Sequence, residues 1–412
     1  MSELYEKACA VKAASKHCFT TEEKNRALRT IADYLLQSKE MILQANREDV
    51  KESAAKGISG AMLDRLTLTE KRIAEMADGV RQVADLPDPI GECMETIDRP
   101  NGLRIQKIRV PLGVIGMIYE ARPNVTVDCA ALTLKTGNGI LLRGSASALC
   151  TNQALVRVIH DALTQSNLPK ELVMLSDSRN HEAVQEMMRL NGIIDVLIPR
   201  GGASLIQNVV QNASVPVIQT GVGNCHIYIH ADAKPDMAEA VVCNAKTSRP
   251  AVCNAAETLL VHEDWVPHLP HLLQTLKANG VTIHGCPKVC ALDKGAVAAE
   301  ESDYAEEYLS LDLAVKIVHD LDEALQHIDR YGTGHTEAIL TENAQAAAIF
   351  LQQVDAACVN HNASTRFTDG FQFGFGAEIG ISTQKLHARG PLGLKELTSY
   401  KYVVYGNGQI RR

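Results

Sequence analysis

Cys253 is the residue of this chain best placed to act as a nucleophile. It lies in the stretch KTSRPAVCNAAETLLVH (Lys246–His262), where an expected helix ends, a polar turn with a proline follows, and an alternating strand begins. A thiol on such a turn is held by two regular elements and still reaches solvent. Arg249 lies four residues before it, and a nearby guanidinium favours the reactive thiolate. The alternative is a buried structural cysteine, because the chain has 11 cysteines and most unpaired cysteines are buried.

Two glycine-containing turns lie where a ligand could bind, and the first is a candidate for holding a phosphate. The first, Pro199–Gly202, follows an expected strand and precedes an expected helix, so the N–H groups of Gly201 and Gly202 would lie at a helix N-terminus. It is not the GxGxxG dinucleotide fingerprint, and a tight turn without a ligand is the alternative. The second turn is Gly221–Asn224. Arg143 ends the apolar run GILLR, where it would face either a ribose with its phosphate or solvent alone.

Composition excludes several classes of protein. A length of 412 residues suggests two or three domains, and 46% hydrophobic with 22% charged residues is typical of a globular protein. A net charge of −8 argues against a nucleic-acid surface but allows a local cationic site. The sequence has no run apolar and long enough to span a membrane and no signal-peptide core, so we expect a cytoplasmic protein. Scattered cysteines without zinc-site spacing predict a reducing compartment and no metal.

The expected elements alternate between helix and strand. Residues 3–84 have a helical repeat of apolar positions. A hairpin around Asn101–Gly102, within residues 90–112, would project as a pairing arm. Short apolar strands separated by helices are then expected at Gly113–Tyr119, Gly139–Arg143, Leu172–Leu175, Ile194–Ile198 and Val215–Gln219. This pattern predicts an α/β fold with a parallel sheet covered on both faces, of the kind that binds ligands at the carboxyl ends of its strands.

A second series of helices and strands begins near residue 231, where we place a change of domain. Residues 235–247 and 265–279 are expected to be helical, and residues 258–261 and 313–318 to be strands. The C-terminal stretch 396–412 alternates like an exposed strand. Because such a strand can pair with another chain, we expect a homo-oligomer.

Five long stretches, in order, resemble one enzyme family over nearly the whole chain. They are VPLGVIGMIYEARPNVTVD (Val110–Asp128), LTLKTGNGILLRGSASA (Leu132–Ala148), RPAVCNAAETLLVH (Arg249–His262), VHDLDEALQHIDRYGTGHTEAI (Val318–Ile339) and NASTRFTDGFQFGFGAEIGISTQKLHARGPLGLKELTSYKYVVYG (Asn362–Gly406). These stretches look like those of the gamma-glutamyl phosphate reductases, or glutamate-5-semialdehyde dehydrogenases, in the aldehyde dehydrogenase superfamily. The resemblance implies NADPH-dependent reduction of L-glutamate 5-phosphate to L-glutamate 5-semialdehyde and phosphate, the second step of proline biosynthesis.

The resemblance also implies a domain organisation. It predicts a Rossmann-type cofactor domain, an α/β catalytic domain and a β-hairpin oligomerisation arm. We expect the cofactor domain at residues 1–230, with the arm at 90–112 and a return segment at 362–395. The catalytic domain with Cys253 would then span 231–361, and an oligomerisation strand 396–412.

By the same resemblance, Cys253 matches the family's nucleophile. A thiolate displaces phosphate from an acyl phosphate and leaves a thioester, which accepts a hydride from the nicotinamide. Asn124 matches the superfamily's oxyanion asparagine and would act with the backbone N–H of Cys253. The alternative for Asn124 is a turn asparagine after Pro123. Thr220 stands where acid-forming aldehyde dehydrogenases carry a glutamate that activates water, and its lack of a carboxylate favours the reductive reaction.

The expected cofactor is NADPH/NADP. Arg143 matches the superfamily's ribose-contacting lysine, and the neighbouring acidic residue that favours NAD is absent, so an arginine here suits a 2′-phosphate. Glu307 resembles the glutamate that holds the nicotinamide ribose, with Glu306 as the alternative register. Gly201 and Gly202, together with Thr220 and Gly221, complete the expected cofactor-binding residues.

The substrate would present a phosphate, a carboxylate and an ammonium group. Candidates for binding the two anions are Arg122, Arg249, Ser364, Thr365 and Arg366. Glu120 or Glu378 would meet the ammonium group. The alternative for each arginine is a structural ion pair or helix cap.

Two other functions remain open at this stage. One is an acylating reductase for a different acyl phosphate or acyl-CoA. The other is a catalytically silent partner of the kinase that makes the acyl phosphate. The chain has no kinase-like segment, so a labile acyl phosphate would arrive from another protein, and we expect a transient contact with glutamate 5-kinase.

Overall fold

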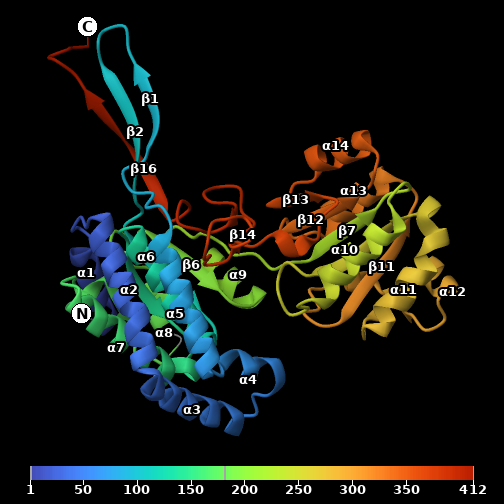
Figure 1. Ribbon diagram of the computed structural model, residues 1–412, viewed down its shortest axis with the longest axis horizontal. Coiled ribbons are helices and arrows are strands. Elements are labelled where there is room, and N and C mark those ends of the chain that lie inside the picture. The colour runs from blue at the N-terminus through green and yellow to red at the C-terminus, as the bar shows by residue number, and fades with distance from the viewer. Residues whose placement is uncertain (1, 181, 412) are drawn as a thin grey trace. The chain divides into compact units, whose positions relative to one another are not determined.

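The chain folds into two compact units (Figure 1), in a computed structural model that describes residues 2–180 and 182–411. Unit 1 contains the residues up to Gln219, the segment Gly374–Gly380 and the residues from Leu392 onward, and unit 2 contains Thr220–Phe373 and Ile381–Pro391. The domain change, expected near residue 231, comes earlier because strand β7 (Cys225–Ile229) already pairs within the unit 2 sheet. Of the expected return segment 362–395, only its parts within Gly374–Gly380 and after Leu392 belong to unit 1.

Unit 1 begins with the helices that the apolar repeat predicted. Thr20 caps helix α2 in a capping box with Glu23, and α2 buries Leu28, Ile31 and Leu35 along one face. Thr69 caps α5 through its side chain alone, which accepts from the backbone N–H of Arg72. The five helices are α1 (Glu3–Ala14), α2 (Thr21–Gln37), α3 (Lys39–Ala55), α4 (Gly60–Leu66) and α5 (Glu70–Asp85).

A parallel four-stranded sheet, in the order β5-β4-β3-β6, follows in unit 1 and confirms the predicted α/β fold. The prediction of a strand at Val215–Gln219 is wrong. Only Val217 bridges to the sheet, beside Leu197, and Pro216 has no N–H to donate to a ladder. The elements are β3 (Val114–Tyr119), α6 (Pro123–Lys135), β4 (Gly139–Arg143), α7 (Leu149–Gln165), β5 (Val173–Leu175), α8 (Glu182–Met187), β6 (Val196–Arg200) and α9 (Ala203–Asn212).

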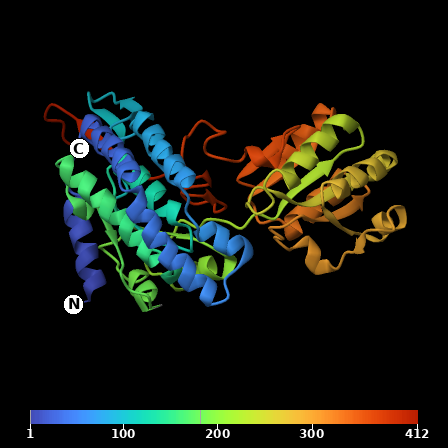
Figure 2. The same ribbon diagram turned by 60° about the horizontal axis from the view of Figure 1, so that its bottom comes forward.

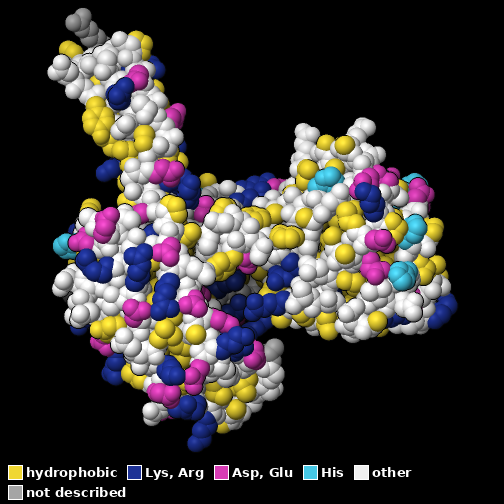
Figure 3. Space-filling model, viewed as in Figure 1, with side chains coloured by type: hydrophobic (Ala, Val, Ile, Leu, Met, Phe, Trp, Pro, Cys, Tyr) yellow, Lys and Arg dark blue, Asp and Glu magenta, His cyan; other side chains and the backbone are white. Residues whose placement is uncertain are grey.

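The predicted hairpin projects from unit 1 as part of an antiparallel arm (Figures 1 and 2). Strands β1 (Cys93–Asp98) and β2 (Arg104–Pro111) meet at a turn in which Gly102 has a φ of +83°, a conformation that favours glycine. Strand β16 (Thr398–Tyr405) pairs with the other side of β2 along its length. It corresponds to the expected strand 396–412, whose last residue, Arg412, lies outside the described residues. Apolar side chains cover part of the arm (Figure 3), and those exposed on β16 are Tyr400, Tyr402, Val404 and Tyr405.

Unit 2 contains a parallel seven-stranded sheet in the order β10-β9-β11-β8-β7-β12-β13. One face of the sheet packs Ile227 and Leu259 into a core with α10 and α11, and the other packs Tyr228 with Phe350 of α14. The elements are β7, α10 (Pro235–Thr247), β8 (Ala256–His262), α11 (Leu269–Ala278), β9 (Thr282–Gly285), α12 (Pro287–Leu292), β10 (Val297–Ala298), β11 (Asp312–Val318), α13 (Leu321–Tyr331), β12 (Thr336–Leu340), α14 (Ala344–Gln353), β13 (Cys358–His361), β14 (Ile381–Ser382) and β15 (Gly390–Pro391).

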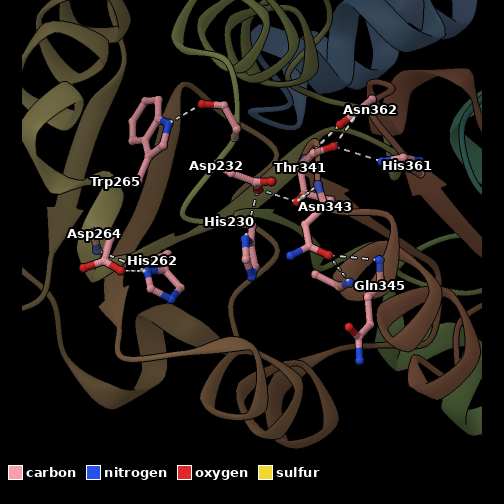
Figure 4. A network of polar contacts seen from close by, with 12 residues as sticks. His230, Asp232, His262, Asp264, Trp265, Thr341, Asn343, Gln345, His361 and Asn362 are labelled. Atoms are coloured by element: carbon pink, nitrogen blue, oxygen red, sulfur yellow. Dashed lines mark hydrogen bonds and ion pairs between the residues drawn. The ribbon is translucent and has the colours of Figure 1, made fainter.

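Internal hydrogen bonds occupy polar groups at the carboxyl edge of the unit 2 sheet (Figure 4). Asp232 accepts from the Thr341 hydroxyl at 2.6 Å and contacts Nδ1 of His230 at 3.1 Å. Asn362, after β13, exchanges two hydrogen bonds of 2.9 Å with the backbone of Thr341. These contacts join the loops that follow β7, β12 and β13. Cys253 precedes β8 and therefore belongs to the opposite, amino edge.

Among the described residues, every helix is too short or too polar to be a membrane span.

Candidate active site

Cys253 lies on the turn between α10 and β8, as the sequence predicted. The helix ends at Thr247, the strand starts at Ala256, and a hydrogen bond of 3.0 Å from Ala255 N–H to the carbonyl of Val252 tightens the turn. Cys253 is half-buried. All eleven cysteines lie in the described residues, and none of them forms a disulfide.

The glycine turn before β7 packs directly on the backbone of Cys253. A β-carbon added to Gly223 would lie 1.5 Å from the Cys253 carbonyl oxygen, so only glycine fits without displacing the Cys253 turn. The thiol of Cys225 lies 3.2 Å from the same oxygen and donates to it. Glu307 accepts a hydrogen bond of 2.6 Å from Gly223 N–H. Of the two alternative glutamates, Glu307 is thus the one that contacts this turn.

Two guanidinium groups lie near the Cys253 turn. Arg366 donates from Nε to the Ser248 hydroxyl at 3.3 Å and from Nη1 to the side chain of Asn254, the residue after the cysteine. Burial lowers the pKa of Arg366, and the positive charge of Arg249 lowers it further. Arg249 is exposed, and within the described residues neither arginine forms an ion pair. Two basic side chains thus lie beside this turn, which we call the cationic turn.

Other predicted residues of unit 2 are more enclosed. The Ser364 hydroxyl accepts from the backbone N–H of Arg366 at 3.3 Å, and Thr365 is fully buried, so both support the Arg366 loop. Thr220 is 1% exposed and bridges to Ser382. Gly221 donates its N–H to the carbonyl of Ile381 at 2.9 Å.

A buried ion pair beside the turn was missed by sequence reasoning. Lys246 Nζ and Glu257 Oε2 are 2.5 Å apart, and both side chains are 0% exposed. The only signal in the sequence was a charged residue inside the last turn of an expected helix and another inside an apolar strand.

Asn124 belongs to unit 1, in the first turn of α6. It is exposed, and its amide donates to the Asp128 carboxylate at 3.0 Å. Burial raises the pKa of the Asp128 carboxyl to about 6. Sequence reasoning missed Asp128, although its i, i+4 spacing from Asn124 places both on one helix face. Arg122 occupies the N-cap position of the same helix.

The turn before α9 differs from its prediction. The N–H of Gly202, expected to be open to a phosphate, donates to Glu120 Oε1 at 3.1 Å. A β-carbon on Gly201 would lie 2.6 Å from the Glu120 carboxyl carbon, so that carboxylate is packed on the turn. Glu378, the other candidate for the ammonium group, lies in the unit 1 segment Gly374–Gly380.

Arg143, at the end of β4, has an incompletely satisfied side chain. It is 8% exposed and donates to the carbonyls of Gly144 and Asn180 at 3.0 and 3.1 Å. Its buried Nε has no hydrogen-bond partner, and no carboxylate of the described residues pairs with it. Burial lowers its pKa. This environment suits an anion supplied from outside the protein.

The predicted site residues thus fall into two groups. Unit 1 holds Asn124, Arg122, Arg143, Gly201 and Gly202, and unit 2 holds Cys253, Thr220, Gly221, Arg249, Glu307, Ser364, Thr365 and Arg366. No three or more His, Cys, Asp or Glu side chains within the described ranges are arranged to hold a metal ion.

Comparisons with known proteins show the family to which the chain belongs. The model of the family described as "Aldehyde dehydrogenase family" matches residues 5–297. The gamma-glutamyl phosphate reductase of Desulforamulus reducens is 57% identical over 406 residues, 98% of each chain, and that of Halalkalibacterium halodurans is 57% identical over 416 residues, 100% of each. The crystal structure of gamma-glutamyl phosphate reductase from Thermotoga maritima has a TM-score of 0.97 at 49% identity and covers 100% of both chains. An acetylating aldehyde dehydrogenase from Geobacillus thermoglucosidasius, 19% identical, covers 100% of this chain and 98% of its own and shares the fold, with a TM-score of 0.72.

Proposed function

Since the chain belongs to the aldehyde dehydrogenase family and, within it, to the gamma-glutamyl phosphate reductases, we propose that it reduces L-glutamate 5-phosphate to L-glutamate 5-semialdehyde and phosphate. NADPH is the proposed reductant and Cys253 the proposed nucleophile. The reaction is the second step of proline biosynthesis. The observation that supports it most directly is the cationic turn, where Arg249 and Arg366 lie near a half-buried thiol and neither is neutralised by an ion pair among the described residues.

The protein's residues would form and break a thioester. The Cys253 thiolate attacks the acyl carbon, the bond from that carbon to the phosphate oxygen breaks, and phosphate leaves with the electron pair. When bound, NADPH supplies the hydride that reduces the acyl carbon. The Asn124 amide and the Cys253 backbone N–H are the proposed donors to the substrate oxygen as it gains negative charge. The carbonyl then re-forms, the bond to sulfur breaks, and the thiolate is regenerated.

Two features support reduction rather than release of an acid. Thr220 carries no carboxylate, so the start of the glycine turn offers no base to activate water against the thioester. The thiol also lies near two guanidinium groups, which suit the phosphate and the carboxylate of the substrate.

The residues of unit 1 fit a phosphorylated nicotinamide cofactor in part. The buried Nε of Arg143 without a partner supports binding of the 2′-phosphate, whereas Gly202 N–H is already used by Glu120. We therefore assign the 2′-phosphate to Arg143 and no phosphate to Gly202. Arg143→Gln should raise KM for NADPH several-fold and leave KM for NADH nearly unchanged, and equal effects on the two would contradict the assignment.

The two units have proposed roles. Unit 1 would bind the cofactor, unit 2 would carry the nucleophile, and the arm with its exposed β16 side chains would join copies of the chain into a homo-oligomer. Sedimentation of the full chain and of a chain ending before β16 tests the last role. A transient contact with glutamate 5-kinase would shield the labile acyl phosphate from water. If this contact forms, an excess of catalytically inactive kinase should compete with the active kinase and slow the coupled reaction.

The proposed reaction is tested in reverse, by reduction of NADP with glutamate semialdehyde and inorganic phosphate. Replacing Arg366 or Arg249 with glutamine should raise KM for phosphate, and the Lys234→Gln variant serves as a control because Lys234 pairs on the surface with Glu342. A requirement for coenzyme A in place of phosphate would favour an acyl-CoA reductase. Cofactor binding without turnover under any condition would favour a silent partner.

A further inference from the structure

The buried ion pair Lys246–Glu257 joins the two elements that hold the nucleophile. Lys246 lies in the last turn of α10, before Cys253, and Glu257 lies near the start of β8, after it. Their charged atoms are 2.5 Å apart with both side chains 0% exposed. The pair therefore bridges the base of the Cys253 turn and fixes where the helix ends relative to the strand.

The pair also reaches the segment that carries Glu307. The second carboxylate oxygen of Glu257 accepts from Leu309 N–H at 3.3 Å, and Leu309 has a φ of +54°, which is uncommon for a residue other than glycine. Two residues earlier, Glu307 accepts from Gly223 N–H at 2.6 Å. Gly223 in turn packs against the Cys253 carbonyl. These contacts therefore connect the ion pair, the Glu307 segment and the glycine turn to the Cys253 turn.

Stability does not account for two charges at this place. Burial lowers the pKa of Lys246 and raises the pKa of Glu257 to about 7, so desolvation disfavours the charged form of each. Apolar residues of similar volume commonly replace a buried ion pair without loss of stability. An apolar pair could not accept the hydrogen bond that Leu309 N–H donates to Glu257, and this directional contact depends on the carboxylate.

We infer that Lys246 and Glu257 are positioning residues that hold the Cys253 turn and the Glu307 segment in one arrangement. The inference rests on the proposed function for its effect on turnover, but its effect on the thiol is measurable without any substrate. Neither residue is assigned contact with the substrate.

The test is the double variant Lys246→Met/Glu257→Leu, which removes both charges and leaves no buried charge unpaired. Its matched control is Lys24→Met/Asp88→Leu, because Lys24 and Asp88 form the corresponding buried pair of unit 1, with exposures of 3% and 7%. Three quantities are measured in each: the melting temperature, the steady-state constants, and the rate at which iodoacetamide alkylates Cys253 between pH 6 and 9. Alkylation is followed by peptide mass spectrometry, with the exposed Cys18 as internal reference.

We expect the double variant to melt within about 4 °C of the unaltered protein. Its kcat should fall about 10²-fold with a smaller change in KM, since a displacement near 1 Å has that effect on a reacting group. The pH profile of Cys253 alkylation should shift while that of Cys18 does not. Glu257→Gln, which keeps an oxygen for Leu309 N–H, should retain more activity than Glu257→Leu.

Two results would overturn the inference. One is a folded double variant whose alkylation profile and kcat stay within twofold of the unaltered protein. The other is an equal loss in the control, which would mean that any buried pair acts through general stability. If the double variant does not fold, Lys246→Met alone is read by the same criteria, because it removes the ion pair while the Glu257 carboxyl, whose pKa is raised, can remain protonated. Absence of phosphate-dependent activity in the unaltered protein would refute the proposed function, whereas a shifted alkylation profile would still support the positioning role.

Discussion

Replacing Gly223 with alanine should displace Cys253, the proposed nucleophile. The added β-carbon would lie 1.5 Å from the carbonyl oxygen of Cys253 and 2.4 Å from its carbonyl carbon, whereas real β-carbons essentially never approach such atoms within 3.0 Å. To lengthen this contact from 1.5 Å to 3.0 Å, the two backbone segments must move apart by about 1.5 Å. Gly223 does not occupy the left-handed region, so the effect is steric and not a matter of backbone conformation.

The size of the effect follows from this displacement. Moving a reacting group by about 1 Å lowers the rate about 10²-fold, which corresponds to about 2.7 kcal/mol of transition-state stabilisation. We therefore expect kcat of Gly223→Ala to fall by at least about 10²-fold in the phosphate-dependent reduction of NADP with glutamate semialdehyde.

The matched control is Gly295→Ala in the same unit. There the added β-carbon would meet only the ends of the Asp293 and Lys277 side chains, each at 3.4 Å, so kcat should be unchanged. Circular dichroism and thermal melting of both variants establish that they fold. A folded Gly223→Ala enzyme with kcat within threefold of the unaltered enzyme would refute the assignment of Gly223 as the support of Cys253.

Three further outcomes are expected. Cys253→Ala should abolish turnover while fluorescence titration still detects cofactor binding, and retained turnover would exclude a covalent route. Thr220→Glu should increase hydrolysis of the thioester, measured as glutamate formed from the semialdehyde with NADP as hydride acceptor and without phosphate, and unchanged formation would remove the role given to this position. The raised pKa of Asp128, about 6, means that the folded protein holds this proton more tightly than the unfolded chain. Its contribution to stability is present at low pH and is lost as pH rises from about 4 through 6, by at most about 3 kcal/mol. Asp128→Asn should make the free energy of unfolding, measured with urea, less dependent on pH in this range. An unchanged pH dependence would show that the carboxyl has an ordinary pKa.

Local signals in the sequence predicted the elements around Cys253 well. The apolar repeat that starts at Pro235 gave the helix 235–247, and the alternation after Cys253 gave the strand that contains residues 258–261. A proline at the first helical position and the alternation of a strand are signals within a few residues, so one sequence reveals them. The failed strand Val215–Gln219 has the apolar content of a strand but also Pro216, which cannot donate to a ladder.

Contacts between distant segments could not be predicted in this way. The need for glycine at position 223 comes from the backbone of Cys253, which a different loop places there. The carboxylate of Glu120 occupies the N–H of Gly202 through a similar long-range approach, so a turn that looked open to phosphate is partly filled. The Lys246–Glu257 pair was overlooked because the sequence shows two charged residues in apolar segments but does not show that their side chains meet.

The pairing of β16 with β2 has a consequence for how the chain is made. The ribosome completes β2 early, yet its partner on one side, from Thr398 to Tyr405, is translated only near the end of the message. Until then one edge of the nascent hairpin stays open to pairing with other strands. A premature stop codon late in the gene would therefore produce a protein with both large parallel sheets present and an open edge on β2. Aggregation through that edge, rather than a defective thiol, would account for the loss of this protein.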